Sequence, residues 1–145
     1  MSPPHAIADA TLSFREAAEP VPLQVMVIED SRLIRERLVD LIATCEGFEV
    51  VAEVETEADA LAALNRQHFD AVIVDLQLRE GSGFGVLSAL RQREERPLTL
   101  VLTNTSIRPV RQRCMALGAH HFFDKSNEFD SVAQALDALR DAVRK

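Results

Sequence analysis

Residues 71–78 read Ala-Val-Ile-Val-Asp-Leu-Gln-Leu and are followed by a glycine-rich turn, Gly81-Ser82-Gly83. The four small or β-branched apolar residues at 71–74 predict a strand that is buried on both faces, which is typical of a parallel sheet. Asp75 closes this run and therefore stands at the carboxyl end of the strand. Ligands of open α/β sheets bind at that edge, so the function depends on which other side chains reach it.

The rest of the chain alternates between strand and helix patterns. Apolar stretches predict four more strands, at residues 23–28, 48–54, 98–102 and 121–123. Helical spacing of apolar residues predicts five helices, near residues 32–45, 57–64, 86–91, 110–117 and 129–143. Ser31 and Thr56 are suited to cap the first two helices, and Gly47 to stop the first.

This alternation predicts a parallel sheet with helices on both faces. Within residues 48–54, Phe48, Val50, Ala52 and Val54 alternate with a second, mostly acidic set. Acids along one side of a strand are typical of a sheet edge, which favours the strand order 2-1-3-4-5. The predicted fold class is therefore α/β, a doubly wound, five-stranded parallel sheet. The first and third strands are then neighbours, and their carboxyl ends form a crevice.

Composition limits the possible functions. The length of 145 residues suits one domain, and we expect residues 1–21 to be a flexible extension and 22–145 to be the domain. A formal charge of −7 argues against a nucleic-acid surface. No apolar run is long enough to span a membrane, and the N-terminus lacks the pattern of a signal peptide, so a cytoplasmic protein is expected. Cys45 and Cys114 are expected to be buried apolar residues, without zinc-type spacing around them.

Polar residues end the predicted strands on one side of the sheet. They are Glu29 and Asp30 after the first strand, Asp75 after the third, Thr103 after the fourth and Lys125 after the fifth. Two carboxylates at ~4 Å repel each other by roughly 4 kcal/mol at an effective dielectric of ~20, and a hard divalent cation such as Mg²⁺ relieves this. A lysine and a hydroxyl opposite the acids can bind phosphoryl oxygens, and Asp75 is placed to be the nucleophile.

At these residues the chain resembles the response-regulator receiver family, the phospho-acceptor domains of two-component signalling. The resemblance covers about residues 23–143 and rests on four motifs: VMVIED (25–30), VIVDLQLREGSG (72–83), LVLT (100–103) and FFDK (122–125). It implies a flavodoxin-like fold and a magnesium site held by Asp30 directly and Glu29 through water. It also implies that Asp75 is phosphorylated and binds the metal, and that Gln77 offers the metal its backbone carbonyl.

The resemblance also implies a switch. Thr103 and Lys125 would contact the phosphoryl oxygens, Thr103 would move toward the phosphate, and Phe122 would change rotamer with it. The signalling surface would then be the face formed by the fourth helix, fifth strand and fifth helix. Gln77 and Thr105 occupy positions that tune dephosphorylation in the family.

The chain departs from the family pattern at a few positions. Arg79 and Ser126 stand where prolines are common, and Phe122 replaces the commoner tyrosine. Asn104 is bulkier than the small residue frequent after the threonine and could narrow access to the acceptor.

The resemblance implies a histidine kinase or a histidine phosphotransfer protein as phosphoryl donor. Because no output domain follows Lys145, we expect the signal to pass to another protein, at present unknown. Neither a nucleic-acid nor a membrane partner is expected, and the domain would be a monomer or a phosphorylation-linked dimer. It would not be an enzyme with a separate substrate, since it would promote only its own phosphorylation and dephosphorylation.

Other interpretations of the same residues are weaker. Taken singly, Asp30 could cap a helix, Lys125 could be a solvated surface charge and Thr103 a strand-end hydroxyl. The sequence 81–85, Gly-Ser-Gly-Phe-Gly, superficially resembles a dinucleotide loop, but it follows the third strand rather than the first. A phosphatase with an aspartyl nucleophile would want an acid where Gln77 stands. The alternative that stays open is a receiver-like protein-interaction module that works without phosphorylation, with Asn104 as its best support.

Overall fold

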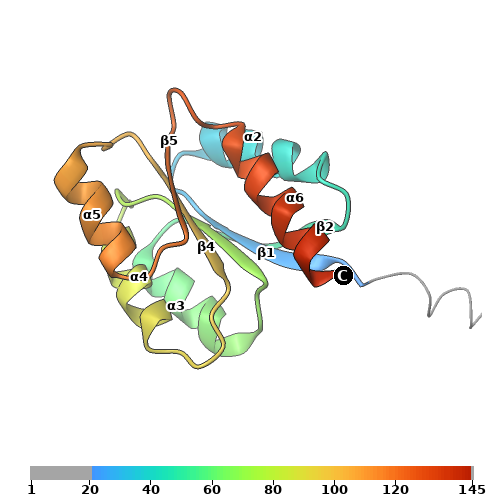
Figure 1. Ribbon diagram of the computed structural model, residues 1–145. Helices are drawn as coiled ribbons and strands as arrows, with labels where there is room; N and C mark the ends of the chain where they lie inside the picture. Colours follow the sequence, from blue (N-terminus) through green and yellow to red (C-terminus); the bar gives the residue numbers. More distant parts are fainter. Residues whose placement is uncertain (1–20, 145) are drawn as a thin grey trace, which may run out of the picture.

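The computed structural model describes residues 21–144 (Figure 1), so the predicted extension at 1–21 lies, except for Val21, outside the described residues. Within that part of the chain the strands form one parallel sheet in the order β2-β1-β3-β4-β5. The α/β fold class and the strand order predicted from the sequence are confirmed. The strands are β1 (Leu23–Ile28), β2 (Phe48–Val54), β3 (Ala71–Val74), β4 (Leu98–Thr103) and β5 (His121–Asp124).

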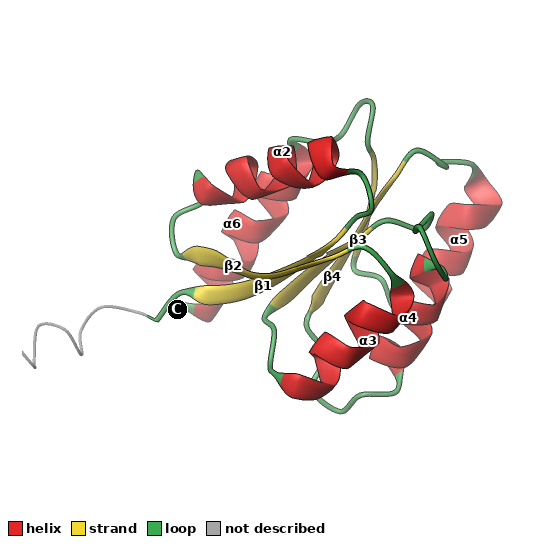
Figure 2. Ribbon diagram, turned by 180° about the vertical axis from the view of Figure 1, so that it is seen from behind, coloured by secondary structure: helices red, strands yellow, loops and turns green. Residues whose placement is uncertain are grey.

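Five helices alternate with the strands in the described residues and cover both faces of the sheet, as Figure 2 shows. They are α2 (Arg32–Ala43), α3 (Glu57–Arg66), α4 (Gly83–Arg91), α5 (Arg108–Ala116) and α6 (Ser131–Val143). The helices α2 and α6 pack on one face, where they bury Leu38, Ile42 and Leu136 against the strands. The helices α3, α4 and α5 pack on the other face. The sheet is therefore the middle layer of three, and β3 is buried along its whole length.

Side-chain caps start three of the helices where the sequence places small polar residues. The hydroxyl of Ser31 accepts a hydrogen bond from the Ile34 N–H at 3.3 Å, and that of Thr56 accepts one from the Asp59 N–H at 3.1 Å. Both predicted caps are confirmed. The stop predicted at Gly47 is displaced, because α2 already ends at Ala43. Gly47 instead forms the turn into β2, with a φ of 88° that favours glycine.

The regular alternation predicted for β2 is wrong in the middle of the strand. The register along β1 jumps between Val25 and Met26, so that Val50 and Ala52 face consecutive residues and Val51 is inserted between them. Phe48 and Val50 therefore pack on the α2 side, whereas Val51, Ala52 and Val54 pack on the α3 side. An extra residue of this kind is tolerated on an edge strand, which has to match only one neighbour.

Within residues 21–144, no helix is both long enough and apolar enough to cross a membrane.

Candidate functional site

Three carboxylates meet at the carboxyl edge of the sheet. Glu29 follows β1 and is 1% exposed, Asp75 follows β3 and is 5% exposed, and Asp30 is the most exposed of the three. One oxygen from each lies within 4.8 Å of the other two. Parallel neighbours end at the same edge of a sheet, and this is why acids far apart in sequence come together. The convergence predicted from the strand ends is present.

Lys125 reaches this cluster from the end of β5. Its Nζ lies 2.7 Å from Glu29 Oε1 and donates a hydrogen bond to Asp75 Oδ2 at 2.8 Å, while its side chain is only 9% exposed. Burial alone would lower the pKa of Lys125, but the hydrogen bonds and charges of Asp75 and Glu29 outweigh it and raise the pKa above its ordinary value. The ammonium is therefore held charged and neutralises part of the anionic cluster.

At Glu29, unlike at Lys125, the effect of burial on the pKa outweighs the effect of the neighbouring charges and hydrogen bonds. Burial raises the pKa of its carboxyl group, the Asp75 charge adds to this, and the contacts with Lys125 and the Ser31 N–H only partly offset it. The Ser31 N–H donates to Glu29 Oε2 at 3.0 Å, which fixes the direction of the carboxylate. A second positive charge near this group would therefore stabilise its ionised form.

Thr103 and Phe122 lie on the neighbouring strands β4 and β5. Thr103 is completely buried at the end of β4, and its Oγ1 accepts a hydrogen bond from the Thr105 N–H at 3.4 Å. Phe122 points into the core on the α3, α4 and α5 side, and the guanidinium carbon of Arg111 lies 5.5 Å from the centre of its ring. Asn104, between Thr103 and Thr105, is exposed.

The loop after Asp75 places Gln77. The Gln77 N–H lies 3.4 Å from Asp75 Oδ1, at the long limit of a hydrogen bond, and Gln77 forms an isolated β-bridge with Ser82. Its side chain is exposed. The main chain of Gln77 is therefore close to the Asp75 carboxylate, and its side chain is exposed, while the role of its carbonyl as a metal ligand stays a prediction.

The donor set suits a magnesium ion. Mg²⁺ binds oxygen ligands at about 2.0–2.1 Å in octahedral geometry and retains several waters, so two of its ligands can be at most about 4.2 Å apart. Carboxylate oxygens within 4.8 Å of one another need only small side-chain movements to reach such spacing. Asp30 and Asp75 would hold the ion directly, with Glu29 through water and the Gln77 carbonyl completing the protein's share.

Sequence patterns did not reveal one arginine near this site. Arg35 is on α2, and its side chain is only 14% exposed. Its Nη1 donates a hydrogen bond to the Glu29 carbonyl at 2.8 Å. Its guanidinium also forms ion pairs with Glu53 of the edge strand β2 and with Glu55, which follows that strand. Arg79, which stands where the family often has proline, pairs with the same Glu55 at 3.4 Å. In the sequence, Arg35 is indistinguishable from a solvated helix residue, because its partners Glu53 and Glu55 are remote from it along the chain.

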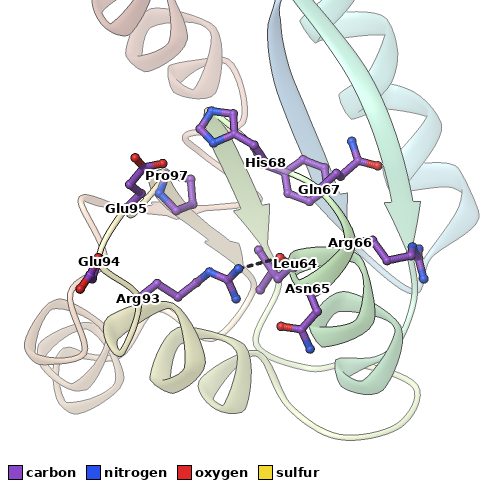
Figure 3. Close-up of a pocket in the computed structure, with 10 residues that line it drawn as sticks. Leu64, Asn65, Arg66, Gln67, His68, Arg93, Glu94, Glu95 and Pro97 are labelled. Carbon is purple, nitrogen blue, oxygen red and sulfur yellow. Dashed lines mark hydrogen bonds between the residues drawn. The ribbon is translucent and has the colours of Figure 1, made fainter.

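A pocket of about 510 Å³ lies at the opposite end of the strands, where β3 and β4 begin (Figure 3). It is lined by the end of α3, the segment before β3 and the segment before β4, and it contains both acidic and basic side chains. Arg93 Nη2 donates to the Leu64 carbonyl at 2.7 Å and so ties the segment after α4 to the end of α3. None of the residues around this pocket belongs to the carboxylate cluster, so the cavity and the candidate chemistry are separate.

Comparison with known proteins identifies the family. The family model of the response regulator receiver domain matches residues 25–137. The chain is a response regulator receiver domain. Receiver domains serve two-component signalling, in which they typically accept a phosphoryl group from histidine kinases and bind Mg²⁺ at an acidic pocket.

Individual relatives agree with this assignment. The nitrate/nitrite response regulator protein NarP of Escherichia coli (strain K12) is 29% identical over 120 residues, which cover 83% of this chain and 56% of that protein. Protein-glutamate methylesterase/protein-glutamine glutaminase 2 of Anaeromyxobacter dehalogenans (strain 2CP-C) is 31% identical over 124 residues, covering 85% and 36%. The receiver domain described here thus spans between about a third and just over half of these two relatives.

A solved structure shows the same fold. The response regulatory domain of protein mrkE from Klebsiella pneumoniae superposes with a TM-score of 0.75 at 22% identity, covering 83% of this chain and 97% of that one. The family resemblance seen in the sequence is confirmed, while the roles of single site residues stay predictions.

Proposed function

We propose that this receiver domain accepts a phosphoryl group on Asp75 from a histidine kinase or a histidine phosphotransfer protein, with Mg²⁺ bound at Glu29, Asp30, Asp75 and the Gln77 carbonyl. The observation that carries the proposal is the position of the Asp75 carboxylate. It stands at the end of the buried strand β3, beside two other acids and 2.8 Å from the Lys125 ammonium. A carboxylate so placed is a nucleophile whose surroundings supply positive charge to an incoming phosphoryl group.

The phosphoryl transfer exchanges the P–N bond of the donor for a P–O bond to Asp75. A carboxylate oxygen of Asp75 forms a bond to phosphorus while the P–N bond of the donor phosphohistidine breaks, and the leaving imidazole keeps the electron pair and takes up a proton. The metal, when bound, neutralises charge on the phosphoryl oxygens. Lys125 contributes its ammonium to the same oxygens, and Thr103 a hydroxyl donor from the end of β4.

Signalling would follow from a shift of population between two arrangements of the domain. A phosphoryl group on Asp75 must bind one arrangement of Thr103 and Phe122 better than the other. We propose that the α5-β5-α6 face carries this change to a separate downstream protein or to a second copy of the domain. Gln77 and Thr105 would set the lifetime of the phosphoryl group by orienting water, so the only turnover would be that of the domain's own phosphate. A cytoplasmic location is part of the same proposal.

The test is phosphorylation with acetyl phosphate, followed by intact-protein mass spectrometry. We expect one phosphoryl group per wild-type chain in the presence of Mg²⁺, none with EDTA, and none in Asp75→Asn. Asp70→Asn is a matched control, since it removes a carboxylate from the segment before the same strand. A wild-type protein that stays unmodified, while adopting its fold by circular dichroism, would instead favour the phosphorylation-independent interaction module.

A further inference from the structure

The glycines that follow Asp75 have a specific structural use. A Cβ placed on Gly85 would collide with the carboxylate of Glu57, and a Cβ on Gly81 would come within 2.5 Å of the Cβ of Glu57. Gly81 also has a φ of 79°. A Cβ on Gly83 would collide with the carbonyl oxygen of Asp75 itself. The turn that superficially resembles a dinucleotide loop is therefore packed against Glu57 on one side and against the acceptor backbone on the other.

Glu57 is the first residue of α3, and it binds this turn through both main chain and side chain. Its N–H donates to the Glu80 carbonyl at 3.1 Å. Its Oε1 accepts a hydrogen bond from the Ser82 N–H at 2.9 Å. Ser82 is the residue that caps α4, so the Glu57 carboxylate lies at the amino end of that helix, where a negative charge is favourable.

Ser82 in turn is connected to the residues around the acceptor. It forms a β-bridge with Gln77, and the next residue, Gly83, donates its N–H to the Leu76 carbonyl at 3.0 Å. The segment 75–82 is thus closed on itself at its base, and Glu57 is an anchor outside the segment that holds this base in place.

We propose that Glu57 is a positioning residue for the acceptor loop: by holding Ser82, it fixes the main chain of Gln77 where its carbonyl can bind the metal. This rests on the function proposed above. Within residues 21–144 the hydrogen bonds of Glu57 go to Glu80 and Ser82 and not to the proposed metal ligands, so it would act on the affinity for Mg²⁺ and leave the carboxylate set itself unchanged.

Two different substitutions interrupt the anchor without altering the acceptor. Glu57→Ala removes the carboxylate. Gly85→Ala keeps Glu57 but drives its carboxylate away from Ser82, because the added methyl group takes its place. Glu57→Gln keeps a hydrogen-bond acceptor of the same reach and removes the charge. Asp59→Asn is the matched control, since Asp59 is an exposed acid in the same first turn of α3.

The measurements are hydrogen exchange at the Ser82 amide, and Mg²⁺ titration followed by amide chemical shifts in heteronuclear NMR spectra. We expect Glu57→Ala to lower Mg²⁺ affinity by roughly tenfold, the low end of what partners of metal ligands contribute, and to speed exchange at Ser82. Gly85→Ala should also lower the Mg²⁺ affinity and speed exchange at Ser82. The double variant Glu57→Ala/Gly85→Ala should bind Mg²⁺ no more weakly than Glu57→Ala alone. Glu57→Gln should retain most of the wild-type affinity, and Asp59→Asn all of it.

Other outcomes overturn the proposal. Unchanged affinity in Glu57→Ala would show that the loop needs no anchor. Equal losses in Glu57→Gln and Asp59→Asn would show a general charge effect instead of positioning. If the wild-type domain bound no Mg²⁺ at all, the proposed function would fail, whereas slow exchange at Ser82 that depends on Glu57 would still establish the anchor.

Discussion

Replacing Lys125 by methionine should destabilise the domain strongly in the absence of divalent ions. The side chain stays unbranched and is one atom shorter, and it loses the charge that lies 2.7 Å from Glu29 and 2.8 Å from Asp75. At an effective dielectric of ~20, each of these attractions is about 6 kcal/mol before desolvation. Desolvation removes most of this gain, and loss of one partner from a buried pair typically costs about 3–5 kcal/mol. Glu29 can take up a proton, since burial already raises its pKa, so we expect a loss near the lower limit, about 3 kcal/mol.

The assay is thermal and urea unfolding, followed by far-ultraviolet circular dichroism, in EDTA and in Mg²⁺. For a domain of this size, about 3 kcal/mol corresponds to a fall in Tm of roughly 10 °C. Mg²⁺ should stabilise Lys125→Met more than it stabilises wild type, because the ion supplies the charge that was removed. Arg32→Gln is the control: it also removes one positive charge, but from an exposed i,i+4 pair with Glu36 that contributes at most about 0.5 kcal/mol.

Two results would refute this reasoning. A Lys125→Met protein within 1 kcal/mol of wild type in EDTA, on the scale of an ordinary surface substitution (roughly 0.5 kcal/mol), would show that the carboxylates do not depend on the ammonium. Equal stabilisation of both proteins by Mg²⁺ would show that the ion and Lys125 do not neutralise the same charges.

Three further predictions concern residues outside the carboxylate cluster. Burial, with the charges of Arg96 and His121, lowers the pKa of His120, whose Nδ1 accepts a hydrogen bond from the Thr99 N–H at 3.0 Å. The contribution of His120 to the free energy of unfolding should therefore be constant above pH 6.5, the ordinary pKa of histidine, and fall as the pH drops below it. Urea titrations of His120→Asn should lack this fall. Ile73→Ala, in the fully buried strand β3, should lower the free energy of unfolding by about 2–5 kcal/mol in the same titrations, and a smaller loss would mean that the core collapses around the cavity. Arg113→Gln removes a guanidinium 3.9 Å from the ring centre of Phe84 and should cost about 0.5–1 kcal/mol by urea unfolding, with no change contradicting a contact between α5 and α4.

Much of the fold was predictable because its strongest signals are local. The run 71–74 is apolar throughout, whereas residues 48–54 include the acids Glu49 and Glu53, and this difference in composition distinguishes a central strand from an edge strand. These two signals favour one order of the strands. That order brings Glu29, Asp75 and Lys125 together, because all strands of a parallel sheet have their carboxyl ends on the same side.

The features that could not be predicted depend on partners distant in sequence. The insertion of Val51 in β2 is set by the register against β1, and no pattern within β2 encodes that register. In the sequence, Glu57 is similarly indistinguishable from an ordinary acid in a first helical turn. The proposed role of Glu57 depends on Gly81 and Gly85, which leave space for its side chain and lie more than 20 residues away in the sequence. Hydrophobic periodicity and secondary-structure propensity describe one helix or strand at a time, whereas these contacts join two elements of secondary structure.

The charges in the site suggest why phosphorylation should require a divalent ion. When Glu29, Asp30 and Asp75 are all ionised, the ammonium of Lys125 balances one of them and leaves two negative charges in excess. A phosphoryl donor is itself anionic, so this excess opposes its approach in a region largely removed from water. A divalent cation carries the compensating charge. A monovalent cation at the same site would leave the excess only half balanced, so we expect Asp75 to be phosphorylated by acetyl phosphate in Mg²⁺ or Mn²⁺ but not in Na⁺ or K⁺ alone. Equal modification in EDTA and in Mg²⁺ would contradict this electrostatic account.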